Sequence, residues 1–420
     1  MHKSIAADAL VIGAGPAGAS TAILLRLAGW RVILVEQQVY PRQKVCGECL
    51  SAGSLALLDQ LGVGVAVRDR AGPELTQLGW MSGVSTLIAP LPPCREGPYR
   101  YGRALGRDQL DAILVNRARE LDVTLIQPAK VRSVRGESGN FECEIQLRAA
   151  EHAPRQRSSR LTTHRVPVVI DAHGSWENGP LDGTRLGPHA RRRGSDLFGF
   201  KASFAHATLA HGLLPVLSFP GGYGGLVIAD SGRLTLAGCI RRDTLASWRA
   251  QLPGASAGAA FEAYLRTFCR GVREMLDVAH RSEPWLSVGP LQPRIRVGTC
   301  RMFSVGNAAG ESHPLIGEGM NMALQSAFML TGQLVEQPVR AIDVNRALGI
   351  QRRYRAQWRG AFEPRLRLAA TLAHMAMRPA LSRPVTRLLQ TWPQLLTAAA
   401  RLAGKARSPV RQSFLLEGTP

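Results

Sequence analysis

The sequence predicts a mixed α/β fold: a Rossmann-like, three-layer domain with an inserted antiparallel-sheet domain and a helical C-terminal region. A strand–glycine loop–helix–strand unit occupies the start of the chain, over residues 8–35. Apolar segments separated by glycines fill residues 198–242 and favour an antiparallel sheet. The chain after Ala341 is helical in character and interrupted by Pro364, Pro379, Pro384 and Pro393. Further helices are expected over 105–120, 256–273 and 319–336, and strands over 123–125, 131–134, 166–170 and 301–305.

The glycine loop predicts a dinucleotide site. Gly13, Gly15 and Gly18 form G-x-G-x-x-G between a strand and a helix. In this motif the first glycine allows a tight turn, the second lets the backbone approach a diphosphate, and the third lets helix and strand pack closely. Glu36 ends the second strand, where its carboxylate can bind ribose hydroxyls. The residues predicted to line this half of the site are Gly13, Gly15, Pro16, Ala17, Gly18, Glu36 and Gln37. The loop alone does not separate NAD from FAD.

Three later stretches decide between them by resemblance. They are Gly106–Asp111, Asp171–Gly174 and Gly306–Met320, and they resemble the flavin-binding pattern of the para-hydroxybenzoate hydroxylase fold, which the geranylgeranyl reductase family shares. In Gly106–Asp111, Arg107 resembles the family's arginine, which implies a contact with the ribityl and phosphate part of FAD. Asp171–Gly174 resembles the family's Asp-Ala-Asp-Gly, with His173 in place of the second aspartate, and it implies cofactor contacts at Asp171 and Gly174.

The third stretch, Gly306–Met320, resembles the family's G-D-A-A-G…P-x-x-G-E-G pattern. Asn307 replaces the aspartate that holds a ribityl hydroxyl, and an amide still donates and accepts hydrogen bonds. The resemblance implies a helix after Gly319 with its N-terminus toward the flavin, where the dipole stabilises negative charge. Predicted cofactor contacts here are Gly306, Asn307, Pro314, Gly317, Gly319 and Met320.

A Cys-Gly-Glu segment at residues 46–48 resembles the signature of the geranylgeranyl reductase-like branch. The resemblance implies that the segment lies along the flavin, with Arg42, Lys44, Cys46 and Gly47 among the cofactor contacts. Cys46 and Cys49 also form C-x-x-C, which leaves a redox dithiol as an alternative. No second C-x-x-C and no paired His–Cys set follows, so no metal site is expected.

The resemblance also implies the domain organisation. We expect a discontinuous FAD-binding domain over 1–75, 103–175 and 290–345, a substrate domain over 76–102 and 176–289, and a helical C-terminal region over 346–420.

The expected function is an FAD-dependent oxidoreductase, with NAD(P)H as electron donor. The Tyr/Phe-x-Trp-x-Phe-Pro stretch of geranylgeranyl reductases and the Trp-x-Trp-x-Ile-Pro stretch of flavin-dependent halogenases are both absent; the nearest segment is Gly222–Val227. This elimination favours a monooxygenase or hydroxylase acting on a small hydrophobic compound, aromatic or polyketide-like. Reduction of an alkene or isoprenoid and a non-catalytic flavin-binding protein remain as alternatives. His313 is a candidate contact to substrate or flavin, or a turn cap, and no catalytic acid or base is predicted.

Composition sets the remaining expectations. The formal net charge is +21, which favours anionic partners, although no nucleic-acid module is visible and no nucleic-acid binding is expected. Seven scattered cysteines and the lack of a signal peptide or a long apolar run indicate a cytoplasmic protein. From Val385 onward, apolar residues recur at helical spacing beside Arg383, Arg387, Arg401, Lys405 and Arg407. This pattern predicts peripheral membrane contact or a stripe packed on the substrate domain.

Overall fold

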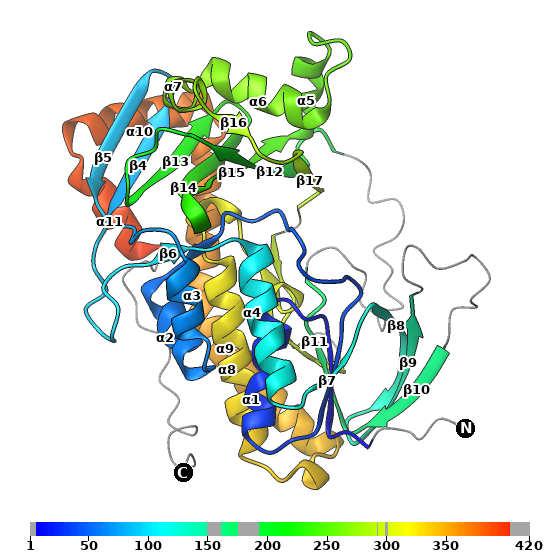
Figure 1. Cartoon of the computed structure of the whole chain (residues 1–420). Helices are drawn as coiled ribbons and strands as arrows, with labels where there is room; N and C mark the ends of the chain where they lie inside the picture. Colours follow the sequence, from blue (N-terminus) through cyan, green and yellow to red (C-terminus); the bar gives the residue numbers. More distant parts are fainter. Residues whose placement is uncertain (1–5, 149–160, 175–192, 292, 299–300, 404–420) are drawn as a thin grey trace.

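The computed structural model describes residues 6–148, 161–174, 193–291, 293–298 and 301–403 (Figure 1). Two sheets dominate it, one parallel and one mainly antiparallel. Of the residues singled out in the sequence, Lys405 and Arg407 lie outside the described residues.

The parallel sheet holds the N-terminal unit. Its strands are β1 (Ala9–Ile12), β2 (Val32–Val35), β7 (Thr124–Ile126), β11 (Val168–Asp171) and β19 (Phe303–Ser304), in the order β19-β11-β1-β2-β7. β1, β2 and β11 are uninterrupted buried runs, as expected for parallel strands that are covered on both faces.

Different layers cover the two faces of this sheet (Figure 1). One face packs against α1 (Pro16–Leu27), α4 (Arg107–Glu120) and α8 (Gly319–Val335). The other packs against a three-stranded antiparallel sheet of β8 (Ala129–Glu137), β9 (Asn140–Leu147) and β10 (Leu161–Val166). The predicted three-layer arrangement is therefore confirmed.

The second sheet runs β16-β12-β15-β14-β13-β4-β5, with β17 also paired to β12. Its strands are β4 (Gln77–Ser82), β5 (Ser85–Pro90), β12 (Leu197–Ala205), β13 (Leu213–Phe219), β14 (Gly222–Ile228), β15 (Leu234–Arg241), β16 (His280–Arg281) and β17 (Leu286–Val288). The antiparallel pairing expected over 198–242 is confirmed. The pair β4–β13 is parallel, and β4 comes from a distant part of the sequence.

Helices cover both faces of the second sheet. α6 (Ala257–Phe268) and α7 (Arg270–Leu276) pack on one face, with α5 (Arg242–Arg249) beside them. The end of α9 (Val344–Ala376), α10 (Pro379–Thr391) and α11 (Gln394–Leu402) pack on the other. The prediction of a single helix over 256–273 is wrong: the helix breaks at Cys269, which has extended φ and ψ, and Ser256 caps α6.

The remaining elements are short. They are β3 (Cys49–Leu50), α2 (Ala52–Gln60), α3 (Gly64–Arg70), β6 (Arg103–Ala104), β18 (Arg294–Ile295), β20 (Gly310–Glu311) and the 3-10 turns Asp230–Gly232, Gly306–Ala308, Pro314–Ile316 and Val339–Ala341.

The prolines of the C-terminal region do not all interrupt helices. Pro393 separates α10 from α11 and Pro379 starts α10, as predicted. Pro364 and Pro384 lie inside α9 and α10, so those two predictions were wrong. Pro364 and Gly360 are both exposed. Because Pro364 has no N–H, the Gly360 carbonyl lacks its helical hydrogen-bond donor, and water can donate to it instead.

Candidate functional site

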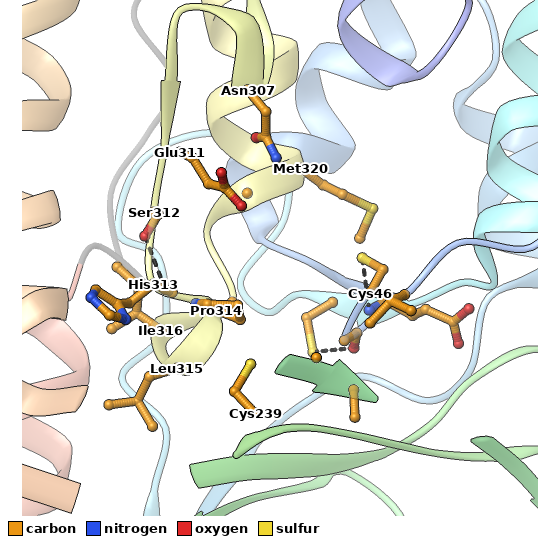
Figure 2. Close-up of a pocket in the computed structure, with 18 of the residues that line it drawn as sticks. Cys46, Cys239, Asn307, Glu311, Ser312, His313, Pro314, Leu315, Ile316 and Met320 are labelled. Atoms are coloured by element: carbon orange, nitrogen blue, oxygen red, sulfur yellow. Dashed lines mark hydrogen bonds between the residues drawn. The ribbon is translucent and has the colours of Figure 1, made fainter. Parts of the chain in front are cut away.

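A cavity of about 460 Å³ lies between the two sheets. Its walls come from the glycine loop, the Cys-Gly-Glu segment, the Gly306–Met320 stretch, strands of the second sheet and helices α9–α11. Figure 2 shows the loop from Asn307 to Met320 above β15, where Cys239 lies.

The glycine loop brings backbone close to the start of α1. Gly13 has φ +97°, and a Cβ on it would lie 2.6 Å from the Ala172 carbonyl oxygen. A Cβ on Gly18 would lie 1.9 Å from the Gly13 oxygen, so this glycine serves helix–strand packing as predicted. Gly15 caps α1 without a side-chain hydrogen bond, which leaves the first N–H groups of the helix available to an anion.

Glu36 ties the end of β2 to this loop. Its side chain is buried, one carboxylate oxygen accepts the Ala14 N–H at 2.9 Å, and the other accepts the Gln38 N–H at 2.9 Å. The carboxylate is therefore fixed beside the loop, on the wall of the cavity.

Three cations converge on the N-terminus of α1. The NH2 atoms of Arg42 and Arg107 both lie 3.7 Å from the position that a Cβ on Gly15 would occupy. Arg107 pairs with Asp111 through two hydrogen bonds of 2.8 Å, and Arg42 lies 3.2 Å from Glu36. Burial, and then the charges of Arg42 and Arg107, lower the pKa of Lys44.

One donor in this cluster is unused by the protein. The buried Nε of Arg42 has no hydrogen-bond partner among the described residues. Cations, open helix N–H groups and an unused buried donor around one space fit a diphosphate. Such a ligand would also relieve the repulsion among the three cations.

The Asp171–Gly174 turn differs from the expectation. The Asp171 carboxylate accepts hydrogen bonds from the backbone N–H and Nδ1 of His173, and Asp171 does not line the cavity. Ala172, His173 and Gly174 do line it. The geometry therefore gives Asp171 an indirect role, as the residue that orients His173, because the aspartate at the strand end points back along its own turn.

The Gly306–Met320 stretch bends around the cavity. Gly306 and Gly317 have φ +59° and +60°, and the Gly306 N–H donates to Ser326 Oγ at 2.8 Å. α8 begins at Gly319, and Gly319 and Met320 line the cavity, so the positive end of the helix dipole faces it. Asn307 and Met320 both project from this region in Figure 2.

The Cys-Gly-Glu segment carries a buried charge that the sequence did not assign. Glu48 has φ +58° and is fully buried, and its carboxylate pairs with the buried ammonium of Lys201. It also accepts from Thr235 Oγ1 at 2.5 Å and from the Arg107 N–H at 3.2 Å. Lys201 and Thr235 belong to β12 and β15, so this cluster fixes the loop to the second sheet.

The two cysteines of the segment do not form a disulfide. Both side chains are thiols, and Cys49 Sγ donates to the Gly47 carbonyl at 3.2 Å. Both line the cavity. Among the described residues no cluster of three or more side chains could hold a metal ion.

Beyond the cations the cavity becomes an apolar chamber, formed by β4, β13 and the C-terminal helices. The residues lining it are Leu78, Trp80, Leu214, Val216, Leu372, Met375, Val385, Leu389, Leu396 and Ala399.

Tyr223 and His313 provide a polar pair on the wall of the chamber, with the Tyr223 hydroxyl oxygen 3.1 Å from His313 Nδ1. Burial, and then the neighbouring His374, lower the pKa of His313, and burial raises the pKa of Tyr223. Burial also raises the pKa of Cys239 to about 12.

Most of the predicted residues therefore meet at one cavity. Those that line it are Gly13, Gly15, Pro16, Ala17, Glu36, Gln37, Arg42, Lys44, Cys46, Gly47, Arg107, Gly174, Gly306, Asn307, Pro314, Gly317, Gly319 and Met320. Gly18 and Asp171 lie behind this surface. Glu48, Lys201 and Cys239 were missed; only Glu48 had a sequence signal, its place in the Cys-Gly-Glu motif.

Comparisons with known proteins agree with this geometry. Residues 6–159 match a family described as FAD binding domain. Menaquinone reductase of Mycobacterium tuberculosis is 30% identical over 147 residues, which cover 35% of this chain and 35% of that protein. Rifampicin monooxygenase of Rhodococcus hoagii is 23% identical over 346 residues, which cover 79% of this chain and 64% of that protein. The chain thus spans about a third of the length of the menaquinone reductase that it matches.

Solved structures share the fold over nearly the whole chain. The flavin-dependent brominase Bmp2 has a TM-score of 0.71 at 16% identity, and the match covers 95% of this chain and 93% of that one. A geranylgeranyl bacteriochlorophyll reductase-like protein from Thermoplasma acidophilum has a TM-score of 0.66 at 17% identity, covering 94% and 99%. At these identities the likeness shows the fold alone. Residues 6–159 therefore resemble an FAD binding domain, and the chain shares the mixed α/β fold of these flavin-dependent proteins.

Proposed function

We propose that the chain is an FAD-dependent oxidoreductase that uses NAD(P)H to hydroxylate or oxidise a small hydrophobic compound. The observation that carries the proposal is the continuity of the cavity, which runs from the cation cluster at α1 into the apolar chamber. A cofactor held by the first part would meet a substrate held by the second.

The residues around α1 fit the diphosphate and ribose of FAD. Arg42, Lys44 and Arg107 supply positive charge, the start of α1 supplies N–H groups, and Glu36 supplies a fixed carboxylate for ribose hydroxyls. In this proposal the Cys46–Glu48 segment and the Gly306–Met320 stretch line the rest of the cofactor, and the N-terminus of α8 stabilises negative charge on it.

Bound FAD supplies two-electron chemistry, and the chain supplies binding, orientation and a dry chamber. The apolar walls exclude water from the substrate. Tyr223 and His313 offer one hydrogen-bonding point to an oxygen-bearing substrate. Because His313 has a lowered pKa, its imidazole is neutral near neutral pH, and Nδ1 shares a hydrogen bond with the Tyr223 hydroxyl in which the tautomer decides the donor.

Similarity to rifampicin monooxygenase over most of this chain supports the hydroxylation reading. A second candidate is the reduction of an alkene or isoprenoid, which the Cys-Gly-Glu segment and the likeness to the Thermoplasma protein favour. A flavin-binding protein without turnover is the third candidate, and nothing in the cavity favours it.

One experiment separates these three candidates. The FAD-loaded protein is mixed with NADH or NADPH and a panel of aromatic, polyketide-like and isoprenoid compounds, and the masses of the products are measured by mass spectrometry. We expect a compound that accelerates NAD(P)H oxidation and gains one oxygen atom. A product that gains two hydrogen atoms would establish the reductase instead. Flavin that no nicotinamide cofactor reduces would contradict both reactions.

The domain boundaries and the contact of the protein with a membrane stay proposals. We propose that the two sheets are the cores of the FAD-binding and substrate domains, with the boundaries given by the sequence. Among the described residues no helix is long and apolar enough to cross a membrane. We also propose that the C-terminal helices make peripheral contact with a membrane.

A further inference from the structure

Helices α10 and α11 have two apolar faces with different surroundings. The inner face lines the cavity through Ser382, Val385, Leu389, Leu396, Ala399 and Ala400. The outer face, which we define as Leu381, Leu388, Trp392, Leu395 and Leu402, is exposed. Trp392 is 49% exposed and Leu402 is 65% exposed, so these large side chains are not parts of the core.

The outer face is regular. Leu381 and Leu388 are seven residues apart in α10, and Leu395 and Leu402 are seven apart in α11, so each pair lies on one side of its helix. Trp392 follows Leu388 by one turn. Scattered exposed apolar residues are ordinary on proteins, but large apolar side chains exposed at helical spacing along two successive helices are typical of an interaction surface.

The charge of this region has one sign. No Asp or Glu occurs between Glu363 and Glu417. Arg378, Arg383, Arg387 and Arg401 are exposed, and none of them forms an ion pair within the part of the chain that the structure describes. Arg383, Arg387 and Arg401 adjoin the outer face in the sequence, and none of them is paired with an acid among the described residues, so an anionic partner would complement this face.

The two helices are fixed to the second sheet. Trp80 Nε1 donates to Thr386 Oγ1 at 2.9 Å, Gln390 Nε2 donates to Ser85 Oγ at 3.2 Å, and Thr397 Oγ1 donates to the Pro90 carbonyl at 2.7 Å. Figure 1 shows α10 and α11 beside β4 and β5, at the edge of the molecule. The inner contacts hold the outer face in place at the periphery of the fold.

We propose that the outer face binds an anionic lipid surface. The tryptophan and leucine side chains enter the headgroup boundary, and the arginines contact lipid phosphates. Helices that lie at a membrane interface combine apolar and basic residues in this way. Since the same helices form a wall of the chamber, a lipophilic substrate reaches the chamber from the membrane; this second step rests on the proposed function. An acidic protein would match the charge alone, but it gives no reason for the exposed tryptophan and leucines.

Vesicle co-sedimentation of the FAD-loaded full chain tests the proposal. The vesicles contain phosphatidylcholine alone, or phosphatidylcholine with phosphatidylglycerol. We expect binding to the anionic vesicles only, weakened by salt. Leu388→Ser/Trp392→Ser should lower binding at least about tenfold, and Arg383→Gln/Arg387→Gln/Arg401→Gln should lower it about a hundredfold.

Matched controls lie elsewhere on the surface. Val65→Ser removes another exposed apolar side chain, and Arg95→Gln/Arg100→Gln/Arg132→Gln removes the same charge. Both controls should bind like the parent protein, and all variants should retain FAD. Equal binding to neutral vesicles, no binding to either vesicle, or equal losses in the outer-face and control variants would overturn the proposal. Because sedimentation needs no turnover, a chain that binds vesicles but oxidises no substrate would refute the proposed function and leave this inference standing.

Discussion

Glu48 and Lys201 form an ion pair that is removed from water between the cofactor wall and the second sheet. Two buried charges are tolerated only as a pair, because the desolvation free energy of a single buried charge would not be offset by a partner of opposite sign. The pair, together with Thr235, sets the position of the Cys-Gly-Glu segment.

Lys201→Met should therefore destabilise the protein by about 3–5 kcal/mol, since it leaves the Glu48 carboxylate buried and unpaired. The free energy of unfolding in urea gives the measurement. The double variant Glu48→Gln/Lys201→Met should regain part of the loss. If the single and double variants were equally stable, the two side chains would not act as a pair.

Glu36→Arg should sharply lower FAD occupancy after reconstitution. The substitution removes the carboxylate that accepts the Ala14 and Gln38 N–H groups and that we place against the ribose. Each hydrogen bond to a charged group is worth about 1.5–3 kcal/mol. Glu36→Gln keeps the shape and should cause a smaller loss; unchanged occupancy in both variants would reject the assignment.

Cys49→Ser should leave turnover nearly intact, because Cys49 Sγ bonds to the Gly47 carbonyl and a serine hydroxyl can do the same. Steady-state turnover of Cys49→Ser is compared with that of Cys46→Ser, both with FAD bound. Equal and severe losses would favour a redox dithiol.

The buried imidazole of His313 predicts a pH dependence. Burial, and then the charge of His374, lower the pKa of His313 below its ordinary value of 6.5. As the pH falls through 6.5, His313 binds a proton in the unfolded chain but stays neutral in the folded chain, so the free energy of unfolding falls. Tyr223, Glu311 and Cys239 also border this part of the cavity, and they are retained when His313 alone is replaced.

His313→Gln should therefore lose less stability than the parent protein between neutral pH and pH values below 6.5. Unfolding in urea of both proteins at each pH gives the comparison, in which other titrating groups cancel. Parallel stability curves for the two proteins would mean that His313 titrates normally.

At the scale of elements, α9 continues through Pro364 because its buried face outweighs one lost hydrogen bond. Trp358, Phe362 and Leu366 are buried on the side of α9 that faces the core, whereas Pro364 and Gly360 are exposed. A pattern of prolines in the sequence shows where a bond is lost, but not how much apolar surface the neighbouring turns bury.

Pro364→Ala should stabilise the protein by roughly 1–3 kcal/mol, since it restores a helical hydrogen bond to the Gly360 carbonyl. Chemical denaturation measures the gain. A variant less stable than the parent would show that the fold requires the proline.

Helix α11 offers a matched pair of neighbouring alanines. Ala399 lines the chamber, whereas Ala398 is exposed. Ala399→Trp should fill the chamber and raise KM or abolish turnover without lowering FAD content, while Ala398→Trp should behave like the parent protein. Equal effects of the two substitutions would mean that α11 is not a wall of the substrate site.

At the scale of the whole molecule, local sequence patterns predicted the backbone that forms one half of the cavity, and the contact of this half with FAD stays a prediction. The glycine loop, Glu36 and the Gly306–Met320 stretch each need a fixed backbone shape, and such shapes restrict the residues in a recognisable way. Packing between distant segments was not predictable in this manner. Lys201 and Glu48 are far apart in the sequence, and the wall made by α10 and α11 depends on how an amphipathic helix is docked, which its own periodicity does not specify.

The central claim is that the cation cluster and glycine loop hold FAD. The most direct measurement is the identity of the nucleotide bound to the purified chain after reconstitution, released by acid and separated by chromatography. We predict FAD, bound without a covalent link, and its loss in Gly13→Val, since a side chain there would clash with the Ala172 carbonyl. Recovery of NAD in place of FAD, or of no flavin at all, would contradict the account.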